Sequence, residues 1–313
     1  MQHYYDWHTF VAELRDSQPA SIAGGCGGPK HYDTDCGPDT RWYGNEQGVG
    51  HETAWAVYKP SNAFPELPNP SYVPIYCDVS IRKGWFWHAN EKPKSLAWLK
   101  TTYLQTVGMN CALQLNVPPN KDGLLEDSDV ERVKEFGSWV KRTFSGTNLL
   151  SKAVSFSQRN NEIAGCFDPG NPDNTLDNDQ TTFWTPYKDD PHVITFWVDT
   201  QKLTVCKGDS YYVTIMENIA FGQVIANHTI QIRSVNDESM SEWETIATGT
   251  TVGYKRIHPV NLLENINRDG VQLRIIITKT VLNAKPQLTN VALHKDADTY
   301  STTCRTLPTK AYK

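Results

Sequence analysis

The 313-residue chain lacks the features that would place it in several large classes of protein. No apolar run approaches the roughly 18 residues of a membrane-spanning helix, so we expect no membrane partner. No block of Lys and Arg is present and the net charge is −5, which argues against nucleic acid or anionic lipid as a partner. The polar N-terminus, Met1-Gln-His-Tyr-Tyr-Asp, has no secretory leader, so the protein is either cytosolic or its beginning is missing.

The seven cysteines contain no C-x-x-C spacing, which weakens a zinc-binding or thioredoxin-like interpretation. Cys26 and Cys36 flank a short loop rich in Gly and Asp, where a disulfide is geometrically easy in an oxidising compartment. Asn227 lies in an N-glycosylation acceptor sequence, which is compatible with secretion. We predict no metal site and no cofactor from these patterns, and the oligomeric state stays open.

Aromatic residues, in contrast, are abundant, with ten tryptophans and fourteen tyrosines. Trp85, Phe86, Trp87 and His88 are consecutive, shortly before a predicted helix. Aromatic rings contribute much of the buried area of most cores, and flat amphipathic rings also suit the faces of sugars. Both interpretations stay open for this cluster.

The first 146 residues alternate helical and strand patterns. Asp6 can cap a helix that reaches about Arg15, and a long loop rich in Gly, Pro and Asp extends to about Pro74. A second helix is predicted from Ser95, with apolar residues at helical spacing: Leu96, Leu99, Tyr103 and Val107.

The segment 111–117 (CALQLNV) alternates like a strand, with Leu113 and Leu115 on the face that helices would cover. A third helix is predicted to open at a capping box, Ser128-Asp-Val-Glu131, with an apolar face of Val130, Val133, Val140 and Phe144. This order of strands and helices predicts a parallel sheet. If the sheet is a barrel, Asn116 is at the catalytic end of its strand.

After Gly146 the pattern changes to short β-type runs separated by turns. Runs such as VITFWVDT, YYVTIMENI, HTIQIRSV and VQLRIIITKTV are typical of an antiparallel sandwich. We therefore divide the chain into residues 1–146 (α/β), residues 147–300 (all-β) and a tail, residues 301–313.

The loop "GPDTRWYGNEQG" (37–48) places Asp39, Arg41, Trp42 and Glu46 among glycines. A carboxylic acid beside an aromatic pocket can have its pKa raised by desolvation and act as a general acid. The alternative is that Asp39 and Arg41 form an ion pair that fixes the loop, with Glu46 solvated.

Three long segments, "GPDTRWYGNE", "CDVSIRKGWFWH" and "GMNCALQLNVPPNKDGLLEDSDVERVKEFGSWVK", resemble the α-L-fucosidases of glycoside hydrolase family 29. They are closest to the branch that includes plant extracellular enzymes, and the resemblance runs from about Gln2 to about Asn290. It implies a (β/α) barrel of the TIM type and hydrolysis of α-linked L-fucose with retention, by an Asp nucleophile and a Glu acid/base. It also implies a fucosylated oligosaccharide or glycoprotein glycan as substrate, no cofactor, and an extracellular, apoplastic or lysosome-like location for the full-length protein.

The resemblance assigns the acid/base role to Glu46, which matches the Glu of the Arg-Trp-x-Gly-Asn-Glu segment. It makes Trp42 and Asn45 of the same segment substrate-binding candidates, and likewise Trp85, Trp87 and His88. The aromatic rings would pack on the methyl group and apolar face of fucose, or else wedge their loop onto the barrel. Asn116 is expected to fix the floor of the site.

Three departures from the family pattern affect these expectations. The family's nucleophile lies in a Trp-Phe-Asp-Gly segment upstream of the helix that begins here with Tyr5-Asp6-Trp7. We therefore expect the chain to be a C-terminal portion that is inactive alone. Tyr76 also replaces a Glu that many relatives carry, and the insertion Cys26 to Asp35 is longer than in many of them, so substrate preference beyond fucose is not transferred.

The segment "TLDNDQTTFWTP" (175–186) resembles a discoidin-like, galactose-binding sandwich, with Asn178 in place of a Gly. Asp177 and Asp179 could ligate calcium, as hard oxygen ligands do, or could only close a turn. The alternative function for the whole chain is therefore a non-catalytic carbohydrate-binding protein in which the barrel segment is a degenerate remnant.

Overall fold

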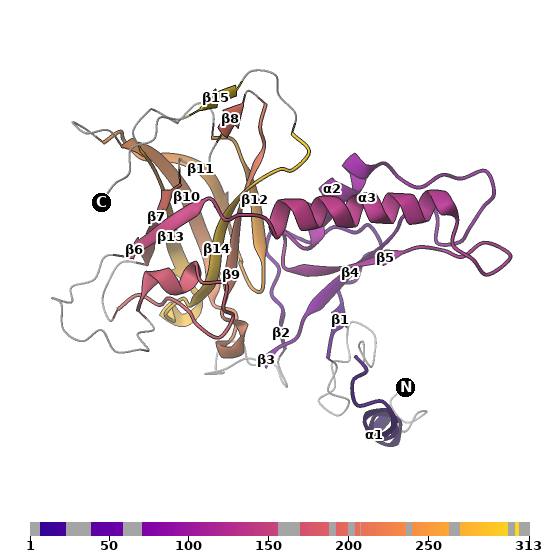
Figure 1. Cartoon of the computed structure of the whole chain (residues 1–313). Coiled ribbons are helices and arrows are strands. Elements are labelled where there is room, and N and C mark those ends of the chain that lie inside the picture. The colour runs from indigo at the N-terminus through magenta and orange to yellow at the C-terminus, as the bar shows by residue number, and fades with distance from the viewer. Residues whose placement is uncertain are drawn as a thin grey trace.

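The computed structural model describes residues 7–22, 39–58, 71–155, 170–187, 192–199, 204–206, 208–235, 240–262, 270–299 and 304–306 (Figure 1). The predicted bridge between Cys26 and Cys36 and the insertion up to Asp35 lie outside the described residues. Among the described helices, none is long and apolar enough to cross a bilayer.

The N-terminal region contains a three-stranded parallel sheet with the order β1-β4-β5. Its strands are β1 (Arg41–Trp42), β4 (Ile75–Ser80) and β5 (Cys111–Asn116). Helix α1 (Trp7–Ser17) precedes the sheet, and β2 (Val57–Tyr58) pairs with β3 (Ser71–Tyr72) in a short antiparallel ladder. The parallel arrangement follows from the helical crossover between β4 and β5, which returns the chain to the same end of the sheet.

Helix α2 (Leu96–Thr106) forms that crossover, and helix α3 (Asp127–Phe144) follows β5. The Ser95 hydroxyl caps α2 by accepting a hydrogen bond from the Trp98 amide at 3.2 Å. Helix α3 begins at Asp127, so the predicted capping box at Ser128 is wrong. The predicted apolar face is also wrong at Val133, which is exposed, because Phe136 and Trp139 provide the buried contacts of α3 instead.

The C-terminal region contains two antiparallel sheets. The five-stranded sheet has the order β11-β10-β13-β7-β6, and the three-stranded sheet has the order β12-β9-β14. The strands are β6 (Leu150–Ser155), β7 (Val193–Val198), β9 (Tyr211–Glu217), β10 (Ile225–Val235), β11 (Glu244–Gly249), β12 (Arg256–Val260), β13 (Gly270–Thr280) and β14 (Leu288–Lys295). A short pair, β8 (Thr204–Cys206) with β15 (Cys304–Thr306), and the 3-10 turns Pro172–Thr175, Ile219–Phe221 and Val281–Asn283 complete this region.

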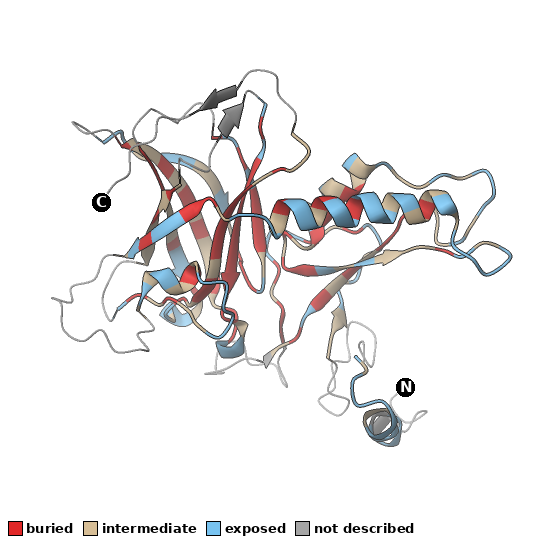
Figure 2. Cartoon of the chain, in the orientation of Figure 1, coloured by how far each residue is buried: buried red, intermediate tan, exposed pale blue. Residues whose placement is uncertain are grey.

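The two antiparallel sheets enclose one hydrophobic core, and their buried residues are red in Figure 2. Strand β7 alternates buried and partly exposed residues, so that Ile194 and Phe196 face the core. Val213 of β9 and Leu293 of β14 enter the same cluster from the three-stranded sheet. This alternation is what a strand with one buried face requires.

The other face of the three-stranded sheet packs against the helices of the N-terminal region. Tyr212 and Ile257 from that sheet join Leu99, Tyr103 and Trp139 in a second cluster. The Trp139 indole N–H donates to Asp296 at 2.9 Å, which satisfies the polar atom of this buried ring. The molecule is therefore layered as helices, three-stranded sheet and five-stranded sheet (Figure 1).

A polar junction also joins the two regions. Residues 52–56 contact the antiparallel sheets through Thr251, whose hydroxyl accepts from the Ala54 amide at 2.8 Å, and through an ion pair between Glu52 and Arg256. Beneath it, the Nε2 atoms of His228 and His258 lie 2.8 Å apart. The junction fixes how the parallel sheet sits on the antiparallel ones.

A disulfide between Cys77 and Cys111 links the neighbouring parallel strands β4 and β5. The Cα atoms are 5.9 Å apart, a usual separation for a bridge. Sequence reasoning considered only the Cys26–Cys36 pair and missed this one.

Candidate functional site

The carboxyl ends of the three parallel strands meet at one edge of the sheet. The loops that follow these strands therefore lie together, and they carry residues 43–50, 81–95 and 117–126. Ligand sites in sheets of this kind form at the carboxyl ends of the strands. All the site residues predicted from the sequence lie at the end of β1 or in the first two of these loops.

Glu46 is exposed in the loop after β1, and its Oε2 atom accepts a hydrogen bond from the Trp85 indole at 3.2 Å. The loop is shaped by Gly44, with φ of +95°, and by Gly48, with φ of +65°. A side chain at Gly48 would also meet Val79 at 2.7 Å. The glycines thus allow the turn that carries Glu46 back toward the sheet.

Asn45 contributes to the shape of the same loop. Its amide donates to the Val49 carbonyl at 3.1 Å, and its oxygen accepts from the Gln47 amide at 3.1 Å. These bonds explain an asparagine here as a loop-fixing residue. A contact with substrate stays a prediction.

Trp42, at the end of β1, is 41% exposed and donates its indole N–H to Asp78 Oδ1 at 2.5 Å. Sequence reasoning did not select Asp78. It is a half-buried carboxylate inside β4, between the buried residues Cys77 and Val79. A charged residue in a mostly buried strand is the signal that could have identified it.

The aromatic cluster divides between partly covered and open rings. Trp85 and Trp87 are half-buried, whereas Phe86 is 78% exposed and His88 is exposed. Among the predicted residues that the structure describes, Trp85 is the one that hydrogen-bonds to Glu46. The side chains of Trp87 and His88 form no hydrogen bond within the described part of the chain.

Two polar side chains, the half-buried Asn116 and the buried Arg82, hold the backbone of this cluster. The Asn116 amide donates to the Trp85 carbonyl at 3.0 Å and to the Ser80 hydroxyl at 3.1 Å. The Arg82 guanidinium donates to the His88 carbonyl at 3.2 Å and pairs with Asp129 at 2.8 Å, with both charges buried. The tryptophans are therefore positioned by contacts to the loop backbone.

Asp39 and Arg41 each interact with a residue outside their own loop. The Asp39 carboxylate accepts from Arg15 at 2.7 Å, and Arg41 donates to the Trp55 carbonyl. These contacts tie the start of β1 to α1 and to the segment before β2. They support a structural role for both residues.

Asp177 and Asp179 close a turn by hydrogen bonds to its own atoms. Asp177 accepts from the Asp179 amide at 2.9 Å and the Thr182 hydroxyl at 2.7 Å, while Asp179 accepts from both the amide and the hydroxyl of Thr181. The Thr181 bonds lower the pKa of Asp179. No group of three or more His, Cys, Asp or Glu side chains that could hold a metal occurs within the described ranges.

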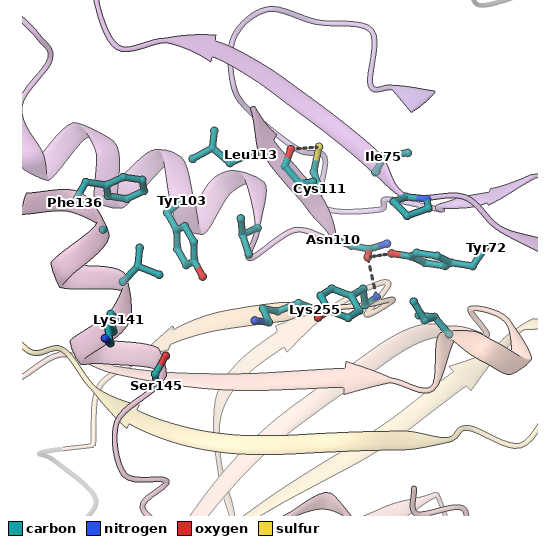
Figure 3. Close-up of a pocket in the computed structure, with 17 residues that line it drawn as sticks. Tyr72, Ile75, Tyr103, Asn110, Cys111, Leu113, Phe136, Lys141, Ser145 and Lys255 are labelled. Carbon is teal, nitrogen blue, oxygen red and sulfur yellow. Dashed lines mark hydrogen bonds between the residues drawn. The ribbon is translucent and has the colours of Figure 1, made fainter. Parts of the chain in front are cut away.

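A cavity of about 770 Å³ lies elsewhere, between α2, α3, β5 and the segment before β12 (Figure 3). Its lining is mostly apolar, and neither Glu46 nor the aromatic cluster contributes to it. Asn110 accepts hydrogen bonds from the Tyr72 hydroxyl at 2.7 Å and the Tyr254 amide at 2.8 Å at one side. Burial raises the pKa of Tyr103 to about 12 and lowers that of Lys255.

Solved glycoside hydrolases share this fold. A family 29 fucosidase of Ruminococcus gnavus, solved with fucose, aligns with 94% of the chain and 58% of its own length, at a TM-score of 0.65 and 23% identity. The family 29 structure SpGH29 aligns with 93% of the chain and 60% of its own length, at a TM-score of 0.69 and 24% identity. The chain thus shares the fold of the aligned parts of these two structures.

Sequence comparison narrows this class. The family model "Alpha-L-fucosidase" matches residues 42–144, which include Glu46, Trp85 and Asn116. The Arabidopsis thaliana protein named Alpha-L-fucosidase 1 is 31% identical over 312 residues, covering 95% of the chain and 55% of that protein. A rice protein, whose name as an α-L-fucosidase 1 is provisional, is 34% identical over 74% of the chain and 44% of its own length.

The chain is a relative of the α-L-fucosidases of glycoside hydrolase family 29. It spans about half the length of the curated relatives that it matches.

Proposed function

We propose that the chain carries the acid/base residue of a retaining α-L-fucosidase and acts, within a longer protein, in releasing α-linked L-fucose from glycans. The observation that supports this most is the exposed Glu46 carboxylate hydrogen-bonded to the Trp85 indole, at the carboxyl edge of the parallel sheet. The family match over residues 42–144 supports the same assignment.

In this proposal the N-terminal region, residues 1–146, is part of a TIM-type barrel. The parallel order β1-β4-β5 with covering helices supports this interpretation. Residues 147–300 are then a galactose-binding-like sandwich, which two antiparallel sheets around one core support, and residues 301–313 are the tail.

The chemistry follows from the position of Glu46. Protonated Glu46 donates its proton to the glycosidic oxygen while an Asp nucleophile attacks the anomeric carbon, and Glu46 then removes a proton from the water that hydrolyses the glycosyl-enzyme. Because Oε2 already accepts from Trp85, we assign the transferred proton to Oε1. The nucleophile is placed outside this chain.

The remaining predicted residues would contact fucose. Trp42, Trp85 and Trp87 offer ring faces for the C6 methyl group, and His88 is free to bind a hydroxyl. Asp78 joins this set because it holds the Trp42 indole. The fucose in the R. gnavus fucosidase supports fucosylated glycans as the substrate class.

The location of the protein is proposed as extracellular or lysosome-like. The Cys77–Cys111 disulfide supports this, because such bridges persist mainly in oxidising compartments.

The test compares the 313-residue chain with a longer protein that includes the upstream barrel segment. We expect the longer protein to release fucose from a natural glycan, and Glu46→Gln to reduce kcat by about 10²- to 10⁴-fold, the usual contribution of a general acid. Glu131→Gln is the matched control, because Glu131 is an exposed glutamate on α3. Unchanged turnover in Glu46→Gln would refute the acid/base assignment.

On this proposal the chain alone should not hydrolyse an aryl fucoside, because the Asp nucleophile would come from the longer protein. Robust turnover by the chain alone, abolished by Glu46→Gln, would show that the nucleophile lies within it. If neither form turns over fucosides but both bind glycans, the non-catalytic carbohydrate-binding alternative is favoured.

A further inference from the structure

The outer face of the five-stranded sheet is not covered by any other described layer. Its inner face packs on the three-stranded sheet, which in turn packs on α2 and α3 (Figure 1). Along β10 and β13 the partly exposed residues alternate with buried ones, so one row of side chains points outward.

Two arginines and a tryptophan meet on this face, beside the edge strand β11. The guanidinium carbon of Arg274 lies 4.0 Å from the centroid of the Trp243 ring, and that of Arg233 lies 4.4 Å from it. Arg233 and Arg274 belong to the neighbouring strands β10 and β13, and Trp243 immediately precedes β11. Each pair is within the distance of a cation–π contact.

Two glutamines fix the orientation of these guanidinium groups. Gln272 accepts from Arg233 Nε at 2.8 Å, and Gln231 accepts from Arg274 Nε at 2.8 Å and Nη2 at 2.6 Å. The Gln231 amide is itself held by the Thr245 hydroxyl at 3.0 Å. We call the five residues Gln231, Arg233, Trp243, Gln272 and Arg274 the Arg–Trp patch.

The charges of the patch are not neutralised within the described residues. Glutamine is a neutral acceptor, and neither arginine forms an ion pair with a described carboxylate. Five other arginines in the described part of the chain form ion pairs with carboxylates: Arg15, Arg82, Arg132, Arg142 and Arg256. Arg233 and Arg274 differ from these arginines because neither pairs with a described carboxylate.

The surroundings of both arginines disfavour the charged form of the guanidinium group. Burial lowers the pKa of Arg233, and burial together with the nearby Arg233 charge lowers that of Arg274. Within the described part of the chain, both Nη atoms of Arg233 and Nη1 of Arg274 have no acceptor. An anion bound here would relieve the repulsion and satisfy these donors.

We propose that the Arg–Trp patch binds an acidic polysaccharide through the carboxylates of its uronic acid residues. The planar guanidinium groups match a carboxylate with two parallel hydrogen bonds, which gives geometric as well as electrostatic selection. The Trp243 ring, beside them, offers an aromatic surface for the C–H face of a sugar. Trp197 of β7 pairs in register with Gln272 and would extend this surface along the sheet.

This site goes beyond the proposed hydrolase function and does not depend on it. The patch lies on the opposite side of the layered structure from Glu46, with the three-stranded sheet between the patch and the helices. It would hold the protein on a matrix of acidic glycans without contributing to catalysis. Binding can therefore be measured whether or not fucose is released.

The experiment titrates the 313-residue chain with an oligogalacturonate and, as matched ligand, with its methyl ester, by isothermal titration calorimetry. We expect the acid to bind, binding to weaken as salt is raised, and the ester to bind at least about tenfold more weakly. The double variant Arg233→Gln/Arg274→Gln should weaken binding of the acid by about tenfold or more. Arg132→Gln, which removes one half-buried positive charge on α3, is the control and should leave binding unchanged.

Two further variants separate charge from geometry and folding. Arg233→Lys/Arg274→Lys keeps both charges but loses the paired hydrogen bonds, and should bind more weakly than the unaltered chain even if the glutamine variant fails to fold. Trp243→Phe keeps an aromatic ring and should weaken binding less than Trp243→Ala. Circular dichroism establishes which variants are folded.

Several results would overturn the proposal. They are absence of binding by the folded unaltered chain, equal binding of acid and ester, and full binding by a folded arginine double variant. Equal affinity for duplex DNA would identify a general polyanion surface instead of a uronate site.

Discussion

The two regions of the molecule are stabilised in different ways. The antiparallel sheets share one large core in which residues such as Phe196, Ile230 and Leu293 are fully buried. The parallel sheet has a much smaller cluster, including Ala54, Ile75 and the disulfide cysteine Cys77. The region that carries Glu46 therefore depends on specific polar contacts and on its neighbours.

This difference explains how the candidate site keeps its geometry. Buried polar pairs, a disulfide and the junction replace the packing that holds the antiparallel sheets. Removing one of these contacts should disturb the parallel region selectively. The size of the disturbance should depend on how deeply the removed contact is buried.

The largest effect is expected from Asp129→Ala. The substitution leaves the Arg82 guanidinium buried without its partner, and breaking a buried pair in this way costs about 3–5 kcal/mol. The free energy of unfolding, measured by urea titration, should fall by that amount. Glu135→Ala is the control, since it removes an exposed ion pair with Arg132 and should cost about 0–1 kcal/mol; equal losses for the two variants would contradict the buried-pair explanation.

Removal of the disulfide should have the next largest effect. Cys77→Ala/Cys111→Ala opens a covalent loop with a sequence separation of 34 residues, and loss of such a bridge costs about 2–4 kcal/mol. Hydrogen exchange should increase in β4 and β5 before it increases in β10 and β13. Uniform acceleration across both regions would show that they do not differ as described.

The junction gives a pH-dependent prediction. Burial and the charge of Arg256 lower the pKa values of both His228 and His258 below the ordinary value near 6.5. The unfolded chain takes up protons first as the pH falls below about 6.5, so these histidines should reduce stability on acidification. In His258→Gln, the loss of unfolding free energy between pH 7 and pH 5 should be smaller by about 1–2 kcal/mol than in the unaltered chain. Urea unfolding at a series of pH values measures this difference.

Glu217 should affect the pH dependence of stability in the opposite direction to His228 and His258, so it serves as an internal comparison. Burial raises its pKa to about 7, so its contribution to stability is present at low pH and is lost as the pH rises through 7. Glu217→Gln should remove this loss. A pH dependence that neither variant changes would exclude the junction as its source.

The smallest effect is expected from Trp42→Phe. This change removes the hydrogen bond from the indole to Asp78 and should lower the free energy of unfolding by about 0.5–1.5 kcal/mol. Because the contact lies at the candidate site, the change in KM for a fucoside in the longer protein, expressed as a free energy, should exceed the change in the free energy of unfolding. Trp98→Phe, a substitution away from this edge on α2, is the control for loss of an indole.

Sequence patterns predicted the local elements well where one physical signal dominates. The apolar spacing after Ser95 correctly located α2, and the alternation of CALQLNV correctly placed Leu113 and Leu115 toward the helices. The start of α3 was misplaced because Glu126 occupies the cap position without a side-chain bond. Acidic residues near a helix start do not by themselves identify the cap.

Contacts between distant segments were not predictable in the same way. The Cys77–Cys111 bridge depends on the register of two strands, and the Trp85–Glu46 bond joins loops 39 residues apart. Family resemblance selected Glu46 as a residue but could not show what holds it. Asp78 was missed because a single carboxylate in a strand carries no motif.

The most direct test of the account is the dependence of the Glu46→Gln variant on the leaving group, measured in the longer protein. An acid/base residue matters most when the departing oxygen needs a proton. Loss of kcat/KM should therefore be about 10²-fold or more on natural glycans and far smaller on a dinitrophenyl fucoside, whose leaving group needs little protonation. Equal losses on both substrates would contradict the role assigned to Glu46.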